Sequence, residues 1–223
     1  MAEGVLLLSE RFYSIQGEST WVGLPCLFIR LSGCNLRCTY CDARYTWNEE
    51  GKPWSHASLL AWIDSFPGIP VEFTGGEPLI QAGVYPLMRD VLARGRTVLL
   101  ETNGSLALDE VPDGVHIIMD VKCPDSGMME HNRPENLALL RERARRGCRD
   151  EIKFVLSSEA DFHWARQQVE QLGADHLLPV LFSPVQPLLP PAELARLLLA
   201  HRLPVRLQLQ LHTLLWPGRD RGV

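Results

Sequence analysis

Apolar residues along the chain gather in short runs, and longer segments of mixed character separate these runs. Seven runs are rich in β-branched, leucine or aromatic residues and lack strict alternation of apolar and polar positions. Such continuous apolar character is typical of strands that are covered on both faces, as in a parallel sheet. The predicted strands cover residues 25–31, 71–74, 97–101, 116–121, 151–156, 178–182 and 205–211.

The segments between these runs carry apolar residues at the three- and four-residue spacing of amphipathic helices. Ser55 and Ser158 stand where side chains cap helix N-termini, and Gly147 and Gly173 stand where helices end. The predicted helices cover residues 55–66, 85–94, 135–146, 159–172 and 191–201. Strands that alternate with helices indicate repeated βα units around a parallel sheet.

One connection departs from this pattern. Residues 102–115 read TNGSLALDEVPDGV, and the glycines and proline in this run predict a loop in place of a crossover helix. The chain has 223 residues, fewer than the roughly 250 of a closed eight-unit barrel. We therefore predict an α/β protein that forms a single domain over residues 1–223. Its expected architecture is an open, partial βα barrel of about six or seven mainly parallel strands with a reduced helix set.

Composition and charge narrow the class of protein. Hydrophobic residues make up 46% of the chain, and 22 basic against 27 acidic residues leave a net charge of −5. An acidic balance argues against a nucleic-acid partner, which usually meets a basic face. The arginines of residues 141–149 alternate with or precede acidic residues, which predicts a solvated helix face with salt bridges.

Location follows from the absence of long apolar runs in the sequence. No run approaches the roughly 18 residues that cross a membrane. The apolar run Val5–Leu8 is too short for a signal-peptide core and lacks a basic flank. We therefore expect a cytoplasmic protein with no membrane partner. Thiols stay reduced in that compartment, so the six cysteines point to metal binding or catalysis before disulfides.

The run GCNLRCTYCD places Cys34, Cys38 and Cys41 at C-x3-C-x2-C spacing. Three thiolates can hold an iron–sulfur cube and leave its fourth iron open for chemistry. A zinc knuckle or an electron carrier would need a fourth ligand, and the next candidate, His56, lies far downstream for a knuckle. An open iron–sulfur site is the preferred interpretation, with a non-catalytic iron–sulfur or zinc module as the alternative. The remaining thiols are interpreted as buried or incidental: Cys26, Cys123 and Cys148.

The three-cysteine motif, with Tyr40 before its last cysteine, resembles that of the radical S-adenosylmethionine enzymes. The run TGGEP at residues 74–78 is similar to a second motif of that family, in which Gly75 and Gly76 let the backbone approach a ligand closely. The resemblance implies a [4Fe–4S] cluster whose open iron holds S-adenosylmethionine. One electron from the cluster cleaves this cofactor to a 5′-deoxyadenosyl radical, which abstracts a hydrogen atom from the substrate. It also implies the partial barrel of the radical S-adenosylmethionine type.

A narrower resemblance runs through most of the chain. The segment 11–38, which contains SIQGE at residues 14–18, and the later runs TGGEPL, ETNG, DVKCP, KFV and LQLH resemble the 7-carboxy-7-deazaguanine synthase family of queuosine biosynthesis. That family consists of lyases that convert 6-carboxy-5,6,7,8-tetrahydropterin to 7-carboxy-7-deazaguanine with loss of ammonia, assisted by Mg²⁺. S-adenosylmethionine is regenerated. The resemblance further implies a homodimer, an electron donor such as flavodoxin or ferredoxin, and no nucleic acid. A small activase that installs a glycyl radical is the alternative enzyme.

The resemblance assigns residues to two ligands. Arg30 lies inside an apolar strand and needs an anion, for which the substrate carboxylate is the expected partner. Gln16 and Glu18 can pair with the amide and amine edge of a pterin. The expected substrate residues are Ile15, Gln16, Gly17, Glu18, Arg30, Thr74 and His212, the last at the end of the final predicted strand. The expected S-adenosylmethionine residues are Gly76, Glu77, Asp120, Val121, Lys122, Ser183, Pro184, Val185 and Gln186. Most of them follow predicted strands, so we expect them on one face of the barrel.

The sequence departs from the family pattern at two places. The family usually has Thr or Ser after the Cys-Asp pair of the cluster motif, and its hydroxyl binds magnesium. Here Ala43 follows Asp42, so we expect a weaker or altered magnesium dependence, with Asp42 as a candidate ligand. The stretch after His212 contains Trp216, Pro217 and Arg219. It is expected to close the pocket or to cover a dimer contact, and a frayed tail is the alternative.

Overall fold

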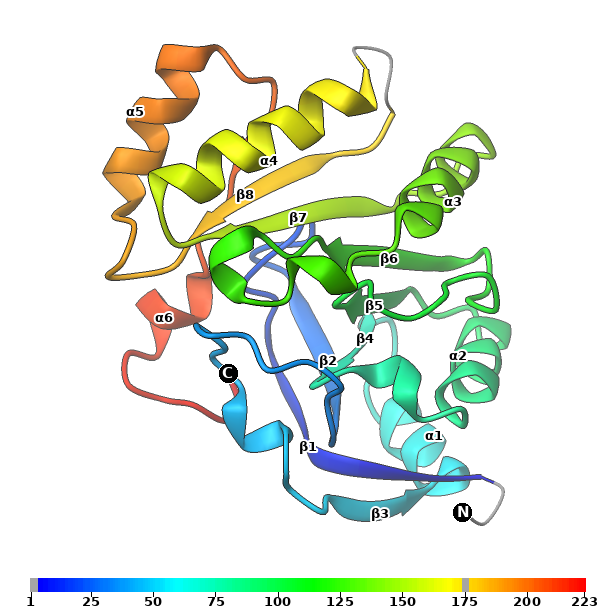
Figure 1. Ribbon diagram of the computed structural model, residues 1–223. Coiled ribbons are helices and arrows are strands. Elements are labelled where there is room, and N and C mark those ends of the chain that lie inside the picture. Colours follow the sequence, from blue (N-terminus) through cyan, green and yellow to red (C-terminus); the bar gives the residue numbers. More distant parts are fainter. Residues whose placement is uncertain (1–3, 174–176) are drawn as a thin grey trace.

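A nine-stranded curved sheet dominates the computed structural model, which describes residues 4–173 and 177–223 (Figure 1). The strands follow one another across the sheet in the order β3-β1-β2-β4-β5-β6-β7-β8-β9. From β2 through β4 to β9 all neighbouring strands are parallel, while β1 pairs antiparallel with both β2 and β3. Their bounds are β1 Val5–Ile15, β2 Pro25–Leu31, β3 Lys52–Ser55, β4 Val71–Gly75, β5 Val98–Thr102, β6 Val115–Asp120, β7 Glu151–Leu156, β8 Val180–Pro184 and β9 Arg206–Leu207.

Among the described residues, five longer helices pack on the outer face of the sheet, and a sixth, short helix lies beside the C-terminus (Figure 1). The part of the chain that the structure describes also contains four short 3-10 turns, η1 Arg44–Thr46, η2 Pro78–Ile80, η3 Pro124–Ser126 and η4 Met129–His131. The helices are α1 His56–Asp64, α2 Val84–Ala93, α3 Pro134–Arg145, α4 Glu159–Leu172, α5 Pro191–His201 and α6 Leu211–Leu215. None of the helices in the described residues is both long and apolar enough to span a membrane.

The helix ends carry the caps that the sequence predicts. The hydroxyl of Ser55 accepts the N–H of Ser58 at 3.2 Å, and that of Ser158 accepts the N–H of Asp161 at 3.1 Å. Each bond satisfies one of the backbone N–H groups that a helix start leaves free. Gly147 follows α3 with a φ of +90°, which a side chain would strain.

Side chains along the parallel strands point alternately to the two faces of the sheet. The outer face packs apolar side chains against the helices, and the inner face carries many polar ones. In β4, Phe73 is buried in the large core against the helices, whereas Glu72 and Thr74 point to the inner side, where they line a pocket. The inner side also holds a small apolar cluster that includes Phe28 and Leu99. The outer core therefore stabilises the barrel, and the inner side is free to carry chemistry.

Several sequence predictions need correction. Strands β1 and β3 were not predicted, because polar residues such as Ser9 and Glu10 interrupt the apolar character of β1. The strand predicted for residues 205–211 is wrong beyond Arg206–Leu207, a short exposed edge strand, and His212 lies on α6. The absence of a helix between β5 and β6 is confirmed.

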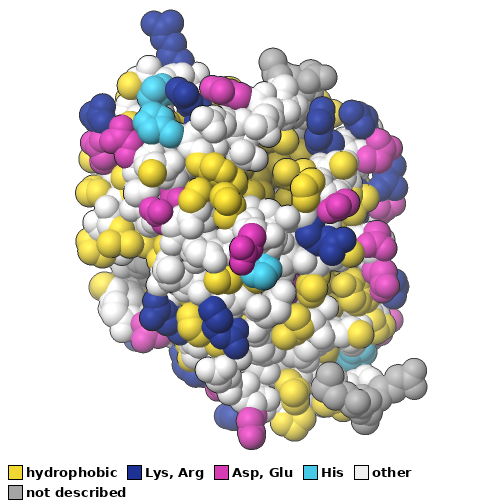
Figure 2. Space-filling view, in the orientation of Figure 1, with side chains coloured by type: hydrophobic (Ala, Val, Ile, Leu, Met, Phe, Trp, Pro, Cys, Tyr) yellow, Lys and Arg dark blue, Asp and Glu magenta, His cyan; other side chains and the backbone are white. Residues whose placement is uncertain are grey.

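The arginine-rich stretch at the end of α3 is only partly a solvated face. Arg145 pairs with Glu142 at 3.2 Å, as the sequence predicts. Arg143, however, is 1% exposed and donates to Asp150 at 2.6 Å, so it ties α3 to the strand that follows. On the face shown in Figure 2, basic and acidic side chains are interspersed instead of forming one basic patch.

Candidate active site

A pocket of about 690 Å³ opens on the inner side of the sheet, at the carboxyl ends of the parallel strands. In βα barrels this is the face where loops from many strands meet and where active sites form. The loop after β2, the ends of β4 to β8, the turn between β1 and β2, and the segment after α6 all contribute to the lining.

Most of the residues expected to form the site meet in this pocket. The expected substrate residues lining it are Ile15, Gln16, Gly17, Glu18, Arg30, Thr74 and His212. The three cysteines line it as well, together with Asp42 and Ala43, and so do Gly76, Asp120, Lys122, Val185 and Gln186. Four expected cofactor residues are not among its lining: Glu77, Val121, Ser183 and Pro184.

Glu77 has a structural position instead. It is fully buried, and its carboxylate accepts N–H groups from Leu79 at 3.0 Å and Asn103 at 2.8 Å, as well as the hydroxyl of Thr102 at 3.0 Å. Burial raises the pKa of Glu77 to about 7, although these donors oppose the rise. The carboxylate thus holds the loop after β4 against the end of β5, beneath the pocket.

Cys34, Cys38 and Cys41 lie on the loop after β2 and share the pocket. Within residues 4–173 and 177–223, no three His, Cys, Asp or Glu side chains converge on a single metal ion. In an open [4Fe–4S] cube each of the three cysteines would bind a different iron. Burial raises the pKa of all three thiols, so it disfavours their thiolate forms. Cationic irons would favour the thiolates and offset this effect.

Two glycines bring the end of β4 against the cluster loop. A Cβ on Gly76 would lie 2.1 Å from the carbonyl oxygen of Gly33, and one on Gly75 would lie 2.3 Å from that of Leu31. Gly75 also has a φ of +146°. No other residue allows this close approach, so the TGGEP motif has a steric reason at these positions.

Asp120 offers a vacant acceptor beside the cluster loop. Its Oδ2 accepts from Lys122 Nζ at 2.8 Å, whereas its Oδ1 is buried and has no hydrogen-bond partner in the described part of the chain. A buried acceptor without a donor is costly unless a ligand supplies one. S-adenosylmethionine carries amino and hydroxyl donors, so Asp120 fits this cofactor, and Gly76 lines the same pocket.

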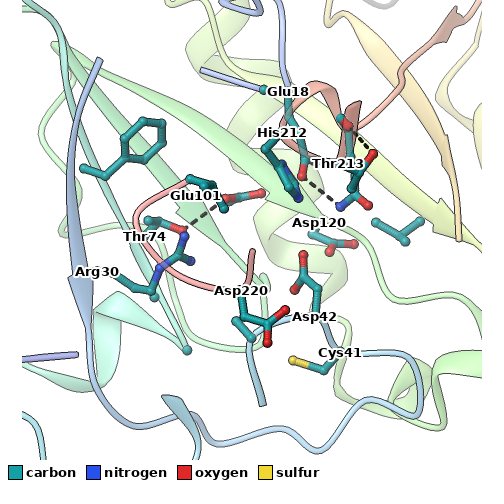
Figure 3. A pocket seen from close by; sticks show the side chains of 18 of the residues that line it. Glu18, Arg30, Cys41, Asp42, Thr74, Glu101, Asp120, His212, Thr213 and Asp220 are labelled. Atoms are coloured by element: carbon teal, nitrogen blue, oxygen red, sulfur yellow. Dashed lines mark hydrogen bonds between the residues drawn. The ribbon is translucent and has the colours of Figure 1, made fainter. Parts of the chain in front are cut away.

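The opposite side of the pocket is strongly charged (Figure 3). Arg30 binds Glu10 through Nε at 2.9 Å, and its two terminal nitrogens have no protein partner among the described residues. Figure 3 shows the guanidinium directed into the cavity beside Thr74 and Glu101. The two terminal nitrogens of a guanidinium present parallel N–H bonds, which are suited to bind a carboxylate in a bidentate manner.

Lys153 stands at the centre of a buried ion network. Its ammonium contacts Glu18 at 2.8 Å and also binds Glu101, which accepts the hydroxyl of Thr74 at 3.1 Å. Burial would lower the pKa of Lys153, but the two carboxylates raise it well above its usual range. For Glu101 the directions are reversed: burial would raise its pKa, but Lys153 lowers it to about 2. Both partners are therefore ionised at neutral pH.

The turn after β1 is held from two sides. Gln16 accepts the N–H of Glu18 at 2.9 Å and donates to Glu72, so its side-chain amide is engaged within the protein. The carbonyl of Gly17 accepts the N–H of Leu211 at 2.9 Å, and a Cβ on Gly17 would lie 3.1 Å from the backbone nitrogen of His212. The SIQGE motif is therefore packed directly against α6.

The segment after α6 crosses the pocket and returns to the cluster loop. Arg221 lies 4.0 Å from the centre of the Tyr45 ring and pairs with Glu49 at 3.2 Å, and the N–H of Gly222 donates to Glu10 at 2.9 Å. Residues of this segment, including Trp216 and Asp220, line the pocket. The tail thus lies along the pocket, where a segment that closes it is expected.

Deleting residues 217–223 should therefore open the substrate side of the pocket. We expect the KM for substrate to rise by about tenfold, the equivalent of one or two lost hydrogen bonds. The melting temperature should change little, because the ion pair of the tail is exposed. Steady-state kinetics and a thermal melt check this, and an unchanged KM would show that the tail is only packed there.

Several residues of the pocket went unrecognised in the sequence. Lys153, Glu101 and Glu72 all line it, and each lies in or at the end of an otherwise apolar strand. Like Arg30, each of these charged side chains lies on an apolar strand and therefore needs a partner. Tyr45 and Gln210 carried no comparable signal.

Comparison with known proteins gives this geometry a context. Residues 28–156 match the Radical SAM superfamily. A 7-carboxy-7-deazaguanine synthase from Chlorobaculum tepidum is 43% identical over 221 residues, covering 99% of both chains. Another from Koribacter versatilis is 40% identical over 231 residues, which cover 97% of this chain and 99% of the relative.

Solved structures share the fold. The crystal structure of QueE from Escherichia coli aligns with a TM-score of 0.74 over 93% of this chain and 95% of its own, at 23% identity. Streptococcus suis SuiB bound to its precursor peptide SuiA aligns with a TM-score of 0.62 over 83% of this chain and 49% of its own, at 14% identity. At these identities the likeness concerns the fold alone.

Proposed function

The chain belongs to the Radical SAM superfamily and, within it, to the 7-carboxy-7-deazaguanine synthases, and from this we infer that it is a lyase of that activity. It converts 6-carboxy-5,6,7,8-tetrahydropterin to 7-carboxy-7-deazaguanine with loss of ammonia. One observation carries the inference most directly: a single pocket joins the three cysteines of an open cluster motif to the terminal guanidinium nitrogens of Arg30. A cofactor-cleaving centre and a carboxylate-binding group thus share one cavity.

The two halves of the pocket have separate tasks. A [4Fe–4S] cluster and S-adenosylmethionine, when bound, supply a radical that abstracts a hydrogen atom from the substrate. Cys34, Cys38 and Cys41 would hold the cluster, and Asp120 would accept a hydrogen bond from the cofactor. The glycines of the TGGEP motif let the end of β4 pack closely against the cluster loop.

The substrate half binds and orients the pterin. Arg30 would hold its carboxylate in a bidentate ion pair. Glu18 and Glu101, both held by Lys153, present carboxyl oxygens that suit the amine and amide N–H groups of a pterin. Because hydrogen bonds and ion pairs hold these side chains before the substrate binds, they lose little conformational freedom on binding. The tail excludes water from the same side.

Magnesium is expected to bind weakly or by other ligands in this chain. Ala43 lines the pocket but offers no side-chain oxygen, whereas the carboxylates of Asp42 and Asp220 face the cavity (Figure 3). We expect Ala43→Thr to lower the Mg²⁺ concentration for half-maximal activity, because a hydroxyl ligand is restored. Metal titrations of both proteins, followed by activity and by calorimetry, check this. A steep dependence in the native protein that is lost in Asp42→Ala would instead assign the site to Asp42.

Partners and location are proposed on the family resemblance. We propose a homodimer, a flavodoxin- or ferredoxin-type electron donor and a cytoplasmic location, with no nucleic acid or membrane involved. The interspersed charges seen in Figure 2 support the lack of a nucleic-acid partner. Light scattering at several concentrations measures the oligomeric state directly.

An anaerobic assay separates this function from its rivals. The cluster-loaded protein is incubated with reductant, S-adenosylmethionine and the carboxytetrahydropterin, and the products are identified by mass spectrometry. Formation of 7-carboxy-7-deazaguanine supports the proposal. Cofactor cleavage without that product would favour a glycyl-radical activase, and one zinc per chain without cleavage would favour a structural module.

A further inference from the structure

The inner face of β4 carries a carboxyl group to which the proposed function gives no task. Glu72 is 2% exposed, yet it is part of the pocket lining. Its partners in register on the flanking strands are Phe28 and Leu99, both buried and apolar. A carboxyl group in such surroundings is costly to ionise, and its presence on an apolar floor calls for a function.

The hydrogen bonds of Glu72 are incomplete. Oε2 accepts a hydrogen bond from Nε2 of Gln16, which fixes the orientation of the carboxyl group. Oε1 has no hydrogen-bond partner within the residues that the structure describes. Because Oε1 is not fully buried and Glu72 lines the pocket, this oxygen is open to the pocket. One oxygen is thus held by the protein, and the other is open to the pocket.

The charges around Glu72 favour its protonated form. Burial raises the pKa of Glu72 well above its usual range, and the carboxylates of Glu101 and Glu18 act in the same direction. Lys153 and Arg30 oppose the rise, but Lys153 is already bound by two carboxylates and Arg30 by Glu10. The thiol of Cys26 lies beside it and is itself kept neutral, because burial raises its pKa. The groups that face Glu72 from β2, β5, β7 and the turn after β1 are Cys26, Arg30, Glu101, Lys153, Glu18 and Gln16.

We propose that Glu72, oriented by Gln16, donates a hydrogen bond from its free carboxyl oxygen to an acceptor on the fused ring of the substrate, and so determines how the ring is seated. The proposal rests on the proposed function, since a pterin ring carries a carbonyl oxygen and ring nitrogens that accept such bonds. A buried carboxylic acid that its surroundings keep neutral is an effective hydrogen-bond donor. Arg30 would then hold one end of the substrate and Glu72 the other.

Two substitutions at this position separate donation from packing. Substrate affinity is measured anaerobically by calorimetry in the cluster-loaded protein with S-adenosylmethionine and without reductant, using the carboxytetrahydropterin as titrant. Glu72→Met removes the donor and should weaken binding by about 10- to 100-fold, because an acceptor on the substrate is left unpaired. Glu72→Gln keeps an N–H donor of the same shape and should bind within a few-fold of the native protein.

The pH dependence gives a readout that a purely structural role would not move. As pH rises through the pKa of Glu72, the native protein loses the donor and gains a negative charge, so substrate affinity should fall. Glu72→Gln cannot ionise, and its affinity for the substrate should stay level over the same range.

The matched control is Glu151→Gln. Glu151 is also buried, its pKa is also raised by burial, and it accepts the N–H of Thr20 at 3.0 Å in the turn after β1. Unlike Glu72, it does not line the pocket. It should keep the native pH dependence.

The outcomes are distinct. Native-like affinity in Glu72→Met, or a native-like pH dependence in Glu72→Gln, would overturn the proposal while leaving the proposed function intact. Failure of the native protein to bind the pterin at any pH would overturn both. Circular dichroism and thermal melts of each variant establish that it is folded, and Glu72→Gln keeps the test decisive if Glu72→Met does not fold.

Discussion

Replacing Cys38 with alanine should abolish the visible absorption of the cluster and, with it, all cleavage of S-adenosylmethionine. The three cysteines line one pocket on the loop after β2, and an open cube has only three protein ligands to begin with. Loss of one leaves two irons without protein ligands, so activity should fall below detection, a loss of more than about a thousandfold in rate, or roughly 4 kcal/mol.

Cys148→Ala provides the matched control. Cys148 is a free, partly exposed thiol after α3 whose sulfur lies 3.5 Å from the carbonyl oxygen of Asp113, far along the chain from the cluster loop. Its removal should leave iron content, sulfide content and turnover unchanged. Equal loss of cluster in both variants would assign the effect to general thiol chemistry and contradict the assignment of the three ligands.

Replacing Lys153 with methionine should have the largest effect on stability. The side chain of Lys153 is 5% exposed and is paired with Glu18 and Glu101, whose side chains are 14% and 28% exposed. Removing one member of a buried ion network leaves uncompensated charge and typically costs about 3–5 kcal/mol. We expect urea unfolding at neutral pH to show a loss of this size, together with loss of substrate binding. Lys52→Met, at an exposed position on β3, is the control and should change stability little.

The sign of the pH effect follows from Glu101. Its pKa is about 2 in the native protein against an ordinary value of 4.5, mainly because Lys153 outweighs the effect of burial. The ionised pair therefore stabilises the native protein fully above about pH 4.5, and this contribution is lost as pH falls toward 2. Without Lys153, burial favours the protonated form of Glu101. The stability difference between native protein and variant should narrow as pH falls through this range, and a constant difference would contradict the role assigned to the pair.

The outer, helix-covered part of the fold could be predicted because local and global signals agree there. The bounds predicted for α4, α5, β2 and β7 are those that the structure has, since continuous apolar runs and caps such as Ser158 act on the same residues. β1 escaped prediction because it pairs antiparallel near the edge of the sheet, where Glu10 and Arg11 are tolerated. The length of β9 was predicted wrongly for the converse reason. The apolar run of residues 205–211 lies at the edge of the sheet, where only two residues pair with β8.

The candidate site divides in the same way. The cysteines and the TGGEP motif were predictable because their chemistry depends on spacing along the chain, and the structure supplies the steric reason for Gly76. Lys153 and Glu72 were missed because their partners, Glu18 and Gln16, are far away in sequence and meet them only across the barrel. A charge in an apolar strand says that a partner exists, but it does not say which one.

The stoichiometry of a many-turnover reaction tests the central claim most directly. The cluster-loaded protein, reductant, a limiting amount of S-adenosylmethionine and excess 6-carboxy-5,6,7,8-tetrahydropterin are mixed under strictly anaerobic conditions, and 7-carboxy-7-deazaguanine, ammonia and 5′-deoxyadenosine are quantified together. We expect equal amounts of deazaguanine and ammonia, both in large excess over the S-adenosylmethionine supplied, because the cofactor is regenerated. Accumulation of 5′-deoxyadenosine with no 7-carboxy-7-deazaguanine would contradict it.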